Sequence, residues 1–194
     1  MLKTRIAVMV SGGGTNLQAL IDAEKSGLIS HGEIVLVASN KSDAYALTRA
    51  EENGIRSFVM KDEASLLETL KEEDIDMIVL AGFLKILSKD FITGFGKPII
   101  NIHPSLIPSF CGKGCYGLHV HEKALEYGVK VTGATVHYVN EIPDGGTIIA
   151  QKAVNILDDD TPEVLQQRVM KEAEWILLPE ATEKLSAEIV KGKN

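Results

Sequence analysis

Short apolar segments alternate with amphipathic segments over the first half of the chain. The apolar segments are rich in Val and Ile and are apolar at successive positions, so both of their faces are apolar. Such segments are typical of parallel β-strands buried between two layers of helices. The predicted strands are Arg5–Val10, Glu33–Ala38, Ser57–Val59, Asp76–Leu80 and Pro98–Ile102.

The segments between these strands have the apolar spacing of helices. Thr15–Ser26 is followed by Gly27, a residue type that commonly ends a helix. Ser42 is a candidate N-cap for a helix over Ala44–Asn53, and Glu63–Glu73 repeats Leu at helical spacing. This alternation predicts a Rossmann-like α/β fold, in which a mostly parallel sheet is flanked by helices.

The pattern changes after residue 103. A loop rich in Gly, Pro and Ser runs to Gly117, and a helix is predicted over His119–Tyr127. Two longer strands, Val129–Val139 and Thr147–Val154, are separated by a short polar segment and are expected to pair as a hairpin. The second half therefore adds antiparallel C-terminal strands to the parallel sheet.

A last helix is predicted to start at Thr161, with Pro162 in its first turn. Pro179 is expected to kink or restart this helix, because proline lacks the backbone N–H that a helix interior uses. The tail Lys191–Asn194 is expected to be frayed.

Composition indicates an ordinary globular protein. The chain has 194 residues, 45% of them hydrophobic, and is expected to form one domain over residues 1–194. A net charge of −7 argues against a nucleic-acid partner. The first apolar run, Ile6–Val10, is too short for a signal peptide or a membrane span, which favours a cytoplasmic protein. The presence of only two cysteines fits the cytoplasm. The sequence does not indicate the oligomeric state.

A glycine-rich loop, Ser11–Asn16, joins the first strand to the first helix. Its backbone N–H groups and the helix N-terminus, together with the side chains of Thr15 and Asn16, could hold a phosphate group. Residue 17 is Leu17, where a dinucleotide fingerprint would have glycine, so a monophosphate fits better. A tight turn without any ligand is the alternative, and it stays open.

Two polar residues, Asn101 and His103, lie at the end of the fifth apolar segment. Because they are two positions apart on a strand, they point to the same face, at the edge where α/β sheets bind ligands. Asp144 in the hairpin turn could fold over these strand ends. These residues are candidates for a proton-transfer site, although an isolated pair could also serve only to bond neighbouring loops.

Longer motifs contain these residues. Asn101–Pro108 is similar to the signature of folate-dependent formyltransferases. Ser11–Gln18 resembles the loop with which purine-pathway members of that family bind the substrate phosphate, and Leu80–Leu87 resembles their folate-pocket segment. Gly133–Val139 with Asp144–Gly146 resembles their catalytic-acid hairpin. The four motifs occur in order over nearly the whole chain, which is more specific than any one of them.

The resemblance implies a reaction and its residues. The amine of 5-phosphoribosylglycinamide would attack the formyl carbon of 10-formyltetrahydrofolate, without a metal. Asn101 and protonated His103 would stabilise the oxyanion, while Asp144 would hold His103 and order a water. The partners implied are small molecules, with residues 1–100 as the phosphate-binding half and 101–194 as the folate and catalytic half.

The resemblance also implies binding residues. Those for the substrate phosphate are Gly14, Thr15 and Asn16. Those for folate are Leu84, Lys85, Ile86, Leu87, Asn101, Asn140, Glu141, Ile142 and Pro143. Glu174 and His119 are the expected contacts to the rest of the substrate, and Lys61 is a candidate for the glutamate tail of the folate.

Glu174 departs from the family pattern in two ways. Trp175 follows it where the family usually has His, and the spacing back to Arg168 is one residue longer than expected. A solvated helix charge is therefore the alternative for Glu174. His137 likewise has two interpretations, as a structural neighbour of the site or as a ligand contact.

Cys111, Cys115, His119 and His121 form a cluster in sequence, but their spacing is not that of a standard zinc site. We expect free thiols in a substrate-side loop and no metal. The competing functions are a formyltetrahydrofolate hydrolase, a methionyl-tRNA formyltransferase and a catalytically silent phosphometabolite-binding module. The hydrolase would need an additional N-terminal regulatory domain, and the tRNA enzyme would need a basic C-terminal domain. The expected single domain with a net charge of −7 therefore disfavours both enzymes.

Overall fold

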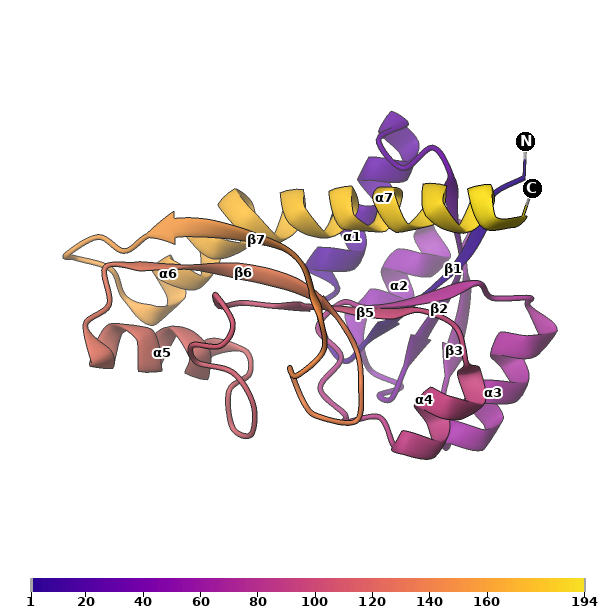
Figure 1. Ribbon diagram of the computed structural model, residues 1–194, viewed down its shortest axis with the longest axis horizontal. Helices are drawn as coiled ribbons and strands as arrows, with labels where there is room; N and C mark the ends of the chain where they lie inside the picture. The colour runs from indigo at the N-terminus through magenta and orange to yellow at the C-terminus, as the bar shows by residue number, and fades with distance from the viewer. Residues whose placement is uncertain (1, 194) are drawn as a thin grey trace.

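The computed structural model describes residues 2–193 and contains a mixed seven-stranded sheet in the order β3-β2-β1-β4-β5-β6-β7 (Figure 1). The first five strands pair in parallel, and β6 and β7 pair antiparallel. Both predictions, the parallel sheet and the antiparallel extension, are confirmed. The strands are β1 Thr4–Val10, β2 Gly32–Ser39, β3 Arg56–Val59, β4 Met77–Leu80, β5 Ile99–His103, β6 Val131–Tyr138 and β7 Ile148–Asn155.

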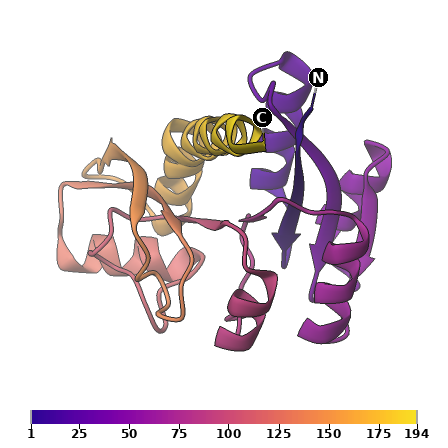
Figure 2. The ribbon, with the colours of Figure 1, turned by 45° about the vertical axis from the view of Figure 1, so that its right-hand side comes forward.

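Helices cover both faces of the sheet, as Figure 2 shows from a second direction. Alternate residues of β1 belong to different cores: Ile6 and Val8 pack in the core that contains α1 and α7 residues, whereas Ala7 and Met9 pack in the core that contains α3 and α4 residues. This alternation explains why the strand is apolar at every position. The helices are α1 Thr15–Ser26, α2 Tyr45–Glu52, α3 Glu63–Glu72, α4 Lys89–Phe95, α5 Leu118–Tyr127, α6 Pro162–Val169 and α7 Trp175–Lys193, with a π-helical segment, η1, over Met170–Glu174. None of the helices described is both long and apolar enough to span a membrane.

Several helix predictions differ from the structure. The helix α4 was not predicted, and Ser42 is not the cap of α2, because Ala44 occupies the N-cap without a side-chain bond. The helix α7 continues through Pro179, and the irregularity lies earlier, in η1. The tail is helical to Lys193, whose ammonium lies 2.5 Å from Asp76 Oδ1; this ion pair holds the end of α7 that was expected to fray. The remaining residue of that tail, Asn194, lies outside the described residues.

The hairpin between β6 and β7 depends on close backbone approach at Gly146. A Cβ at this position would lie only 1.7 Å from the carbonyl oxygen of Tyr138. Any residue with a side chain would therefore push the two strands apart at the turn that carries Asp144. The glycine thus fixes where this turn can lie relative to the end of β5.

Candidate functional site

A cavity of about 490 Å³ opens at the carboxyl ends of β4 and β5, where α/β sheets usually bind ligands. Its lining comes from both halves of the chain, including the hairpin turn and the loop before α5. The lining residues are Asn16, Leu80, Gly82, Phe83, Leu84, Lys85, Ile86, Leu87, Asn101, Ile102, His103, Pro104, Gly112, Lys113, Gly114, Cys115, Tyr116, Gly117, His121, His137, Val139, Asn140, Ile142, Pro143, Asp144, Gln166, Met170 and Glu174.

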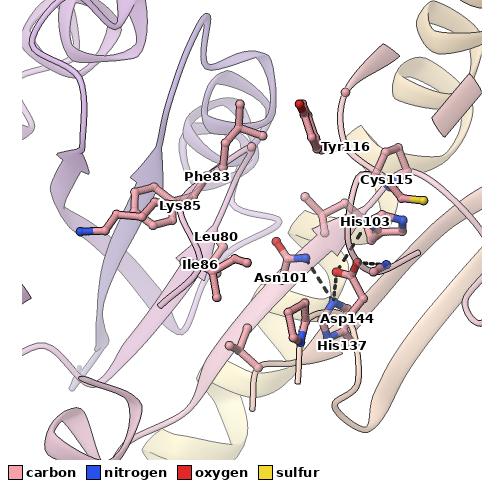
Figure 3. Close-up of a pocket in the computed structure, with 18 of the residues that line it drawn as sticks. Leu80, Phe83, Lys85, Ile86, Asn101, His103, Cys115, Tyr116, His137 and Asp144 are labelled. Carbon is pink, nitrogen blue, oxygen red and sulfur yellow. Dashed lines mark hydrogen bonds and ion pairs between the residues drawn. The ribbon is translucent and has the colours of Figure 1, made fainter. Parts of the chain in front are cut away.

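Asn101, His103 and Asp144 come together in this cavity (Figure 3). The sheet register sets part of this arrangement, because Asn101 pairs across β5 and β6 with His137. Asp144 Oδ1 lies 3.7 Å from His103 Nδ1 and 3.6 Å from His137 Nε2. Both separations allow an ionic interaction but exceed hydrogen-bonding distance.

The backbone fixes the orientation of the two histidines. His103 Nε2 lies 3.0 Å from the carbonyl oxygen of Phe110 and so must donate to it, which leaves Nδ1 facing Asp144. His137 Nδ1 likewise donates to the carbonyl oxygen of Tyr138, at 2.8 Å. In the neutral imidazole, His137 Nε2 then accepts from the side-chain amide of Asn101, at 3.1 Å. One amide hydrogen of Asn101 remains for a ligand.

Asp144 is held as a carboxylate. Its backbone has a φ of 56°, and its Oδ2 accepts a hydrogen bond from the backbone N–H of Gly112 at 2.8 Å. Burial alone would raise the pKa of Asp144, but the contact with His137, the charge of His103 and the Gly112 N–H together hold this pKa below its usual value. The site therefore keeps a negative charge beside two imidazoles in a largely desolvated cavity.

The two other histidines near the cavity occupy different environments. His121 is fully buried, lines the cavity and has no hydrogen-bond partner on either ring nitrogen. Burial, together with the charge of His103, lowers the pKa of His121 to about 4. His119, the predicted substrate contact, is exposed, does not line the cavity and lies 2.7 Å from Glu122. The structure thus brings His121, rather than His119, to the site.

Glu174 is buried and not solvated. Its Oε2 accepts a hydrogen bond from Asn16 Nδ2 at 2.6 Å, and both residues line the cavity. Burial raises the pKa of Glu174, and the Asn16 bond only partly opposes that rise. The π-helical segment η1 explains the unusual sequence spacing, because a π turn accommodates one residue more than an α turn.

The glycine loop reaches the cavity only at its end. Asn16 lines the cavity, whereas Gly14 and Thr15 lie beside it, at the N-terminus of α1. Gly14 has a φ of 73°, and a Cβ there would lie 2.6 Å from the Cβ of Ala46, so only glycine fits this turn. The hydroxyl of Ser11 accepts the N–H of Leu84 at 2.9 Å, which ties this loop to the segment after β4.

Most of the predicted folate residues line one part of the cavity. All of Leu84–Leu87 do so, as do Asn140, Ile142 and Pro143 from the hairpin turn. Glu141 is exposed and is not part of the lining. Lys61 does not line it either, so Lys85 and Lys113 are the lining lysines.

Several other lining residues were not predicted from the sequence. Gln166 and Met170 lie one helical turn apart, on the segment that precedes Glu174, so that spacing was a usable signal. Tyr116 and Gly112 come from the loop before α5, whose path no periodicity could predict. Among the described residues, no three His, Cys, Asp or Glu side chains are grouped as metal ligands, and the prediction of a metal-free site stays a prediction.

The chain is similar to known proteins along nearly its whole length. The sequence profile of the formyl transferase family matches residues 4–182. A chloroplastic phosphoribosylglycinamide formyltransferase of Arabidopsis thaliana is 40% identical over 180 residues, which cover 88% of this chain but only 61% of the plant protein. A phosphoribosylglycinamide formyltransferase of Haemophilus influenzae is 42% identical over 184 residues, 90% of this chain and 84% of that protein.

Solved structures agree with this similarity. Glycinamide ribonucleotide transformylase 1 from Symbiobacterium toebii superposes with a TM-score of 0.88 at 39% identity, covering 96% of this chain and 89% of that one. Phosphoribosylglycinamide formyltransferase from Brucella melitensis gives a TM-score of 0.86 at 42% identity, covering 95% and 96%. The chain therefore belongs to the formyl transferase family.

Proposed function

We propose that this chain transfers the formyl group of 10-formyltetrahydrofolate to the amine of 5-phosphoribosylglycinamide, a step of purine biosynthesis. The observation that supports it most is the convergence of Asn101, His103 and Asp144 in one cavity with the buried Asn16–Glu174 pair. A site of this kind offers oxyanion donors at one place and polar groups for a second substrate close by. Relatives named for this reaction support the choice of substrates.

The reaction needs stabilisation of one developing charge. When the neutral amine attacks the formyl carbon, the carbonyl π bond breaks and negative charge appears on the formyl oxygen. The free amide hydrogen of Asn101 and the Nδ1–H of protonated His103 are the donors available to that oxygen. Both donors are fixed by backbone or strand-paired partners, so little reorganisation is needed during the reaction.

Asp144 acts through its charge and through a proton route. Its carboxylate brings a negative charge beside His103, at an Nδ1–Oδ1 separation of 3.7 Å. A water beside this carboxylate can take the proton from the attacking amine and deliver it to the folate nitrogen, whose bond to the formyl carbon then breaks. The step forms one C–N bond and breaks another, and it needs no metal or covalent enzyme intermediate.

The two ends of the cavity suit different substrates. The loop at Gly14–Asn16, which reaches the cavity at Asn16, and the buried Glu174 support a phosphorylated, hydroxyl-bearing substrate. The segment Leu84–Leu87 offers apolar side chains for a flat pterin ring. Lys85 has no ion-pair partner among the described residues, so its ammonium is available to the carboxylates of the glutamate tail.

The absorbance change that accompanies conversion of 10-formyltetrahydrofolate to tetrahydrofolate tests this function. We expect turnover only when 5-phosphoribosylglycinamide is present, and a much lower rate from the Asp144→Asn variant. Turnover without the amine would indicate a hydrolase instead. Tight binding of the phosphorylated amine without any turnover would indicate the silent binding module.

A further inference from the structure

The two cysteines of the chain, Cys111 and Cys115, lie four positions apart in one loop, and Cys115 lines the cavity. Both thiols are free and half-buried. Cys111 Sγ donates to the carbonyl oxygen of Pro108 at 3.3 Å, and Cys115 Sγ lies 3.1 Å from the ammonium of Lys123. Neither thiol has a part in the proposed transfer.

We propose that Cys111 and Cys115 form a dithiol site that low-molecular-weight disulfides oxidise to an intramolecular disulfide, and that this oxidation weakens the hold on Asp144. Formation of the disulfide is independent of the proposed function, whereas its effect on Asp144 rests on that function. The site would make formyl transfer sensitive to the thiol–disulfide balance of its surroundings.

The loop has the backbone freedom that closure of the disulfide requires. Between the cysteines lie Gly112, with a φ of 81°, and Gly114, with a φ of 79°. The N–H of Cys115 bonds to the carbonyl oxygen of Gly112 at 3.0 Å, so the segment already folds back in a turn. A disulfide requires Cα atoms roughly 4.4–6.8 Å apart, which a turn flanked by glycines can reach.

The surroundings of the two thiols assign them different roles. Cys115 lines the cavity, where a small disulfide can reach it, and its Sγ lies 3.1 Å from the ammonium of Lys123. Burial raises the pKa of Cys111, and the negative charge of Asp144 raises it further, so this thiol stays protonated longer. Cys115 therefore attacks first and Cys111 resolves.

The chemistry balances as ordinary thiol–disulfide exchange. The thiolate of Cys115 attacks one sulfur of the reagent disulfide, forming a mixed disulfide and releasing one reagent thiol. Cys111 then loses its proton and attacks the Cys115 sulfur, releasing the second reagent thiol. The protein is oxidised by two electrons, and the reagent disulfide is reduced to two thiols.

Formation of the disulfide affects Asp144 through the hydrogen bond from Gly112. This residue lies between the cysteines, and its N–H donates to Asp144 Oδ2 at 2.8 Å. In the disulfide, Cys111 Sγ has no hydrogen to donate to Pro108, and the sulfur of Cys115 is an uncharged atom beside Lys123, so both contacts that hold the loop are weakened. The peptide group of Gly112 moves with the two cysteines, and Asp144 loses its one backbone donor.

Intact mass spectrometry after incubation with oxidised glutathione tests the site. We expect the wild-type chain to lose two hydrogen atoms, Cys111→Ser to keep one glutathione adduct on Cys115, and Cys115→Ser to react at least several-fold more slowly. A wild-type chain that accumulates only adducts or disulfide-linked dimers would overturn the proposal. So would a Cys115→Ser variant that reacts as fast as the wild type.

Activity before and after oxidation tests the coupling to Asp144. We expect kcat of the oxidised wild type to fall several-fold and to recover with dithiothreitol. The Cys111→Ser/Cys115→Ser double variant, compared with its own untreated sample, should be insensitive. Unchanged kcat in a fully disulfide-bonded sample would refute the coupling. A reduced wild type without any transferase activity would instead refute the proposed function and leave the mass result standing.

Discussion

Asn101 and His137 lie opposite each other on β5 and β6, and the side-chain amide of Asn101 donates to His137 Nε2 at 3.1 Å. The second nitrogen of His137 is occupied by the carbonyl oxygen of Tyr138. His137 is buried and so cannot exchange either partner for water. Besides its contact with Asp144, His137 therefore holds the Asn101 amide in the orientation that presents one hydrogen to the cavity.

This relationship predicts that His137→Ala lowers kcat through Asn101. We expect a loss of roughly tenfold, the size of one neutral hydrogen bond, with the KM for both substrates nearly unchanged. The measurement is a double-mutant cycle with Asn101→Ala. If His137 acts through Asn101, the double variant should be little worse than Asn101→Ala alone. Independent, additive losses would show that His137 has another role.

His103→Ala should lower kcat far more than it changes substrate binding. The imidazole acts mainly on charge that develops in the transition state, and loss of one such donor costs roughly 100- to 1000-fold. Steady-state kinetics with both substrates would separate kcat from KM, and circular dichroism would verify that the fold is retained. A variant that kept most of its turnover would contradict the assignment.

The pH profile follows from the lowered pKa of Asp144. Because this pKa lies below the usual carboxyl value of 3.8, Asp144 remains ionised under mildly acidic conditions. The rate should therefore rise with pH as the attacking amine deprotonates, and not as Asp144 ionises. Asp144→Asn should lower kcat/KM at each pH without moving the acid limb. A flat wild-type profile from mildly acidic to mildly basic pH would argue against rate control by the amine.

Stability should fall in mild acid because of His121. Its pKa is about 4 in the folded chain, against 6.5 as the ordinary value, so its stabilising contribution is complete above pH 6.5 and is lost as the pH falls toward 4. Between about pH 7.5 and about pH 5 the free energy of unfolding should drop by about 2 kcal/mol from this residue. Urea denaturation at both pH values measures the drop.

Two variants on the same helix isolate this effect. His121→Gln removes the titrating group and should reduce the pH dependence, although the variant is less stable overall. His119→Gln, two residues away and exposed, should keep the pH dependence of the wild type. Equal slopes for wild type and His121→Gln would mean that other groups cause the acid sensitivity.

The limits of the strands were predicted from the sequence more accurately than the position of the irregular helical segment. Strand limits agreed within a few residues, because β1 and β4 are buried on both faces and must be apolar throughout. The helix does not restart at Pro179, as the sequence allowed, because α7 runs through this residue. The missing N–H of a proline is tolerated inside α7, and the extra residue of the segment is accommodated upstream, in the π turn at Met170–Glu174.

The candidate catalytic residues were easier to predict from the sequence than the residues that hold them in position. Asn101 and His103 alternate on a strand, and a hairpin brings Asp144 to them, so local pattern and topology sufficed. The choice between His119 and His121 depended on how α5 is rotated against the sheet, which two histidines at a helix start do not specify. Gly112 N–H contacts Asp144 through a loop conformation that has no sequence period.

Glu174 offers the clearest test of how the phosphorylated substrate is held. Because its carboxylate is buried in the cavity and accepts from Asn16, Glu174→Gln should raise the KM for 5-phosphoribosylglycinamide by about tenfold or more, as expected for loss of a charged hydrogen-bond acceptor. The KM for the folate should change little. Glu172→Gln is the matched control, since Glu172 lies in the same π turn but is exposed. A similar rise in both variants would attribute the effect to the turn itself, and a rise in the folate KM alone would place Glu174 at the other end of the cavity.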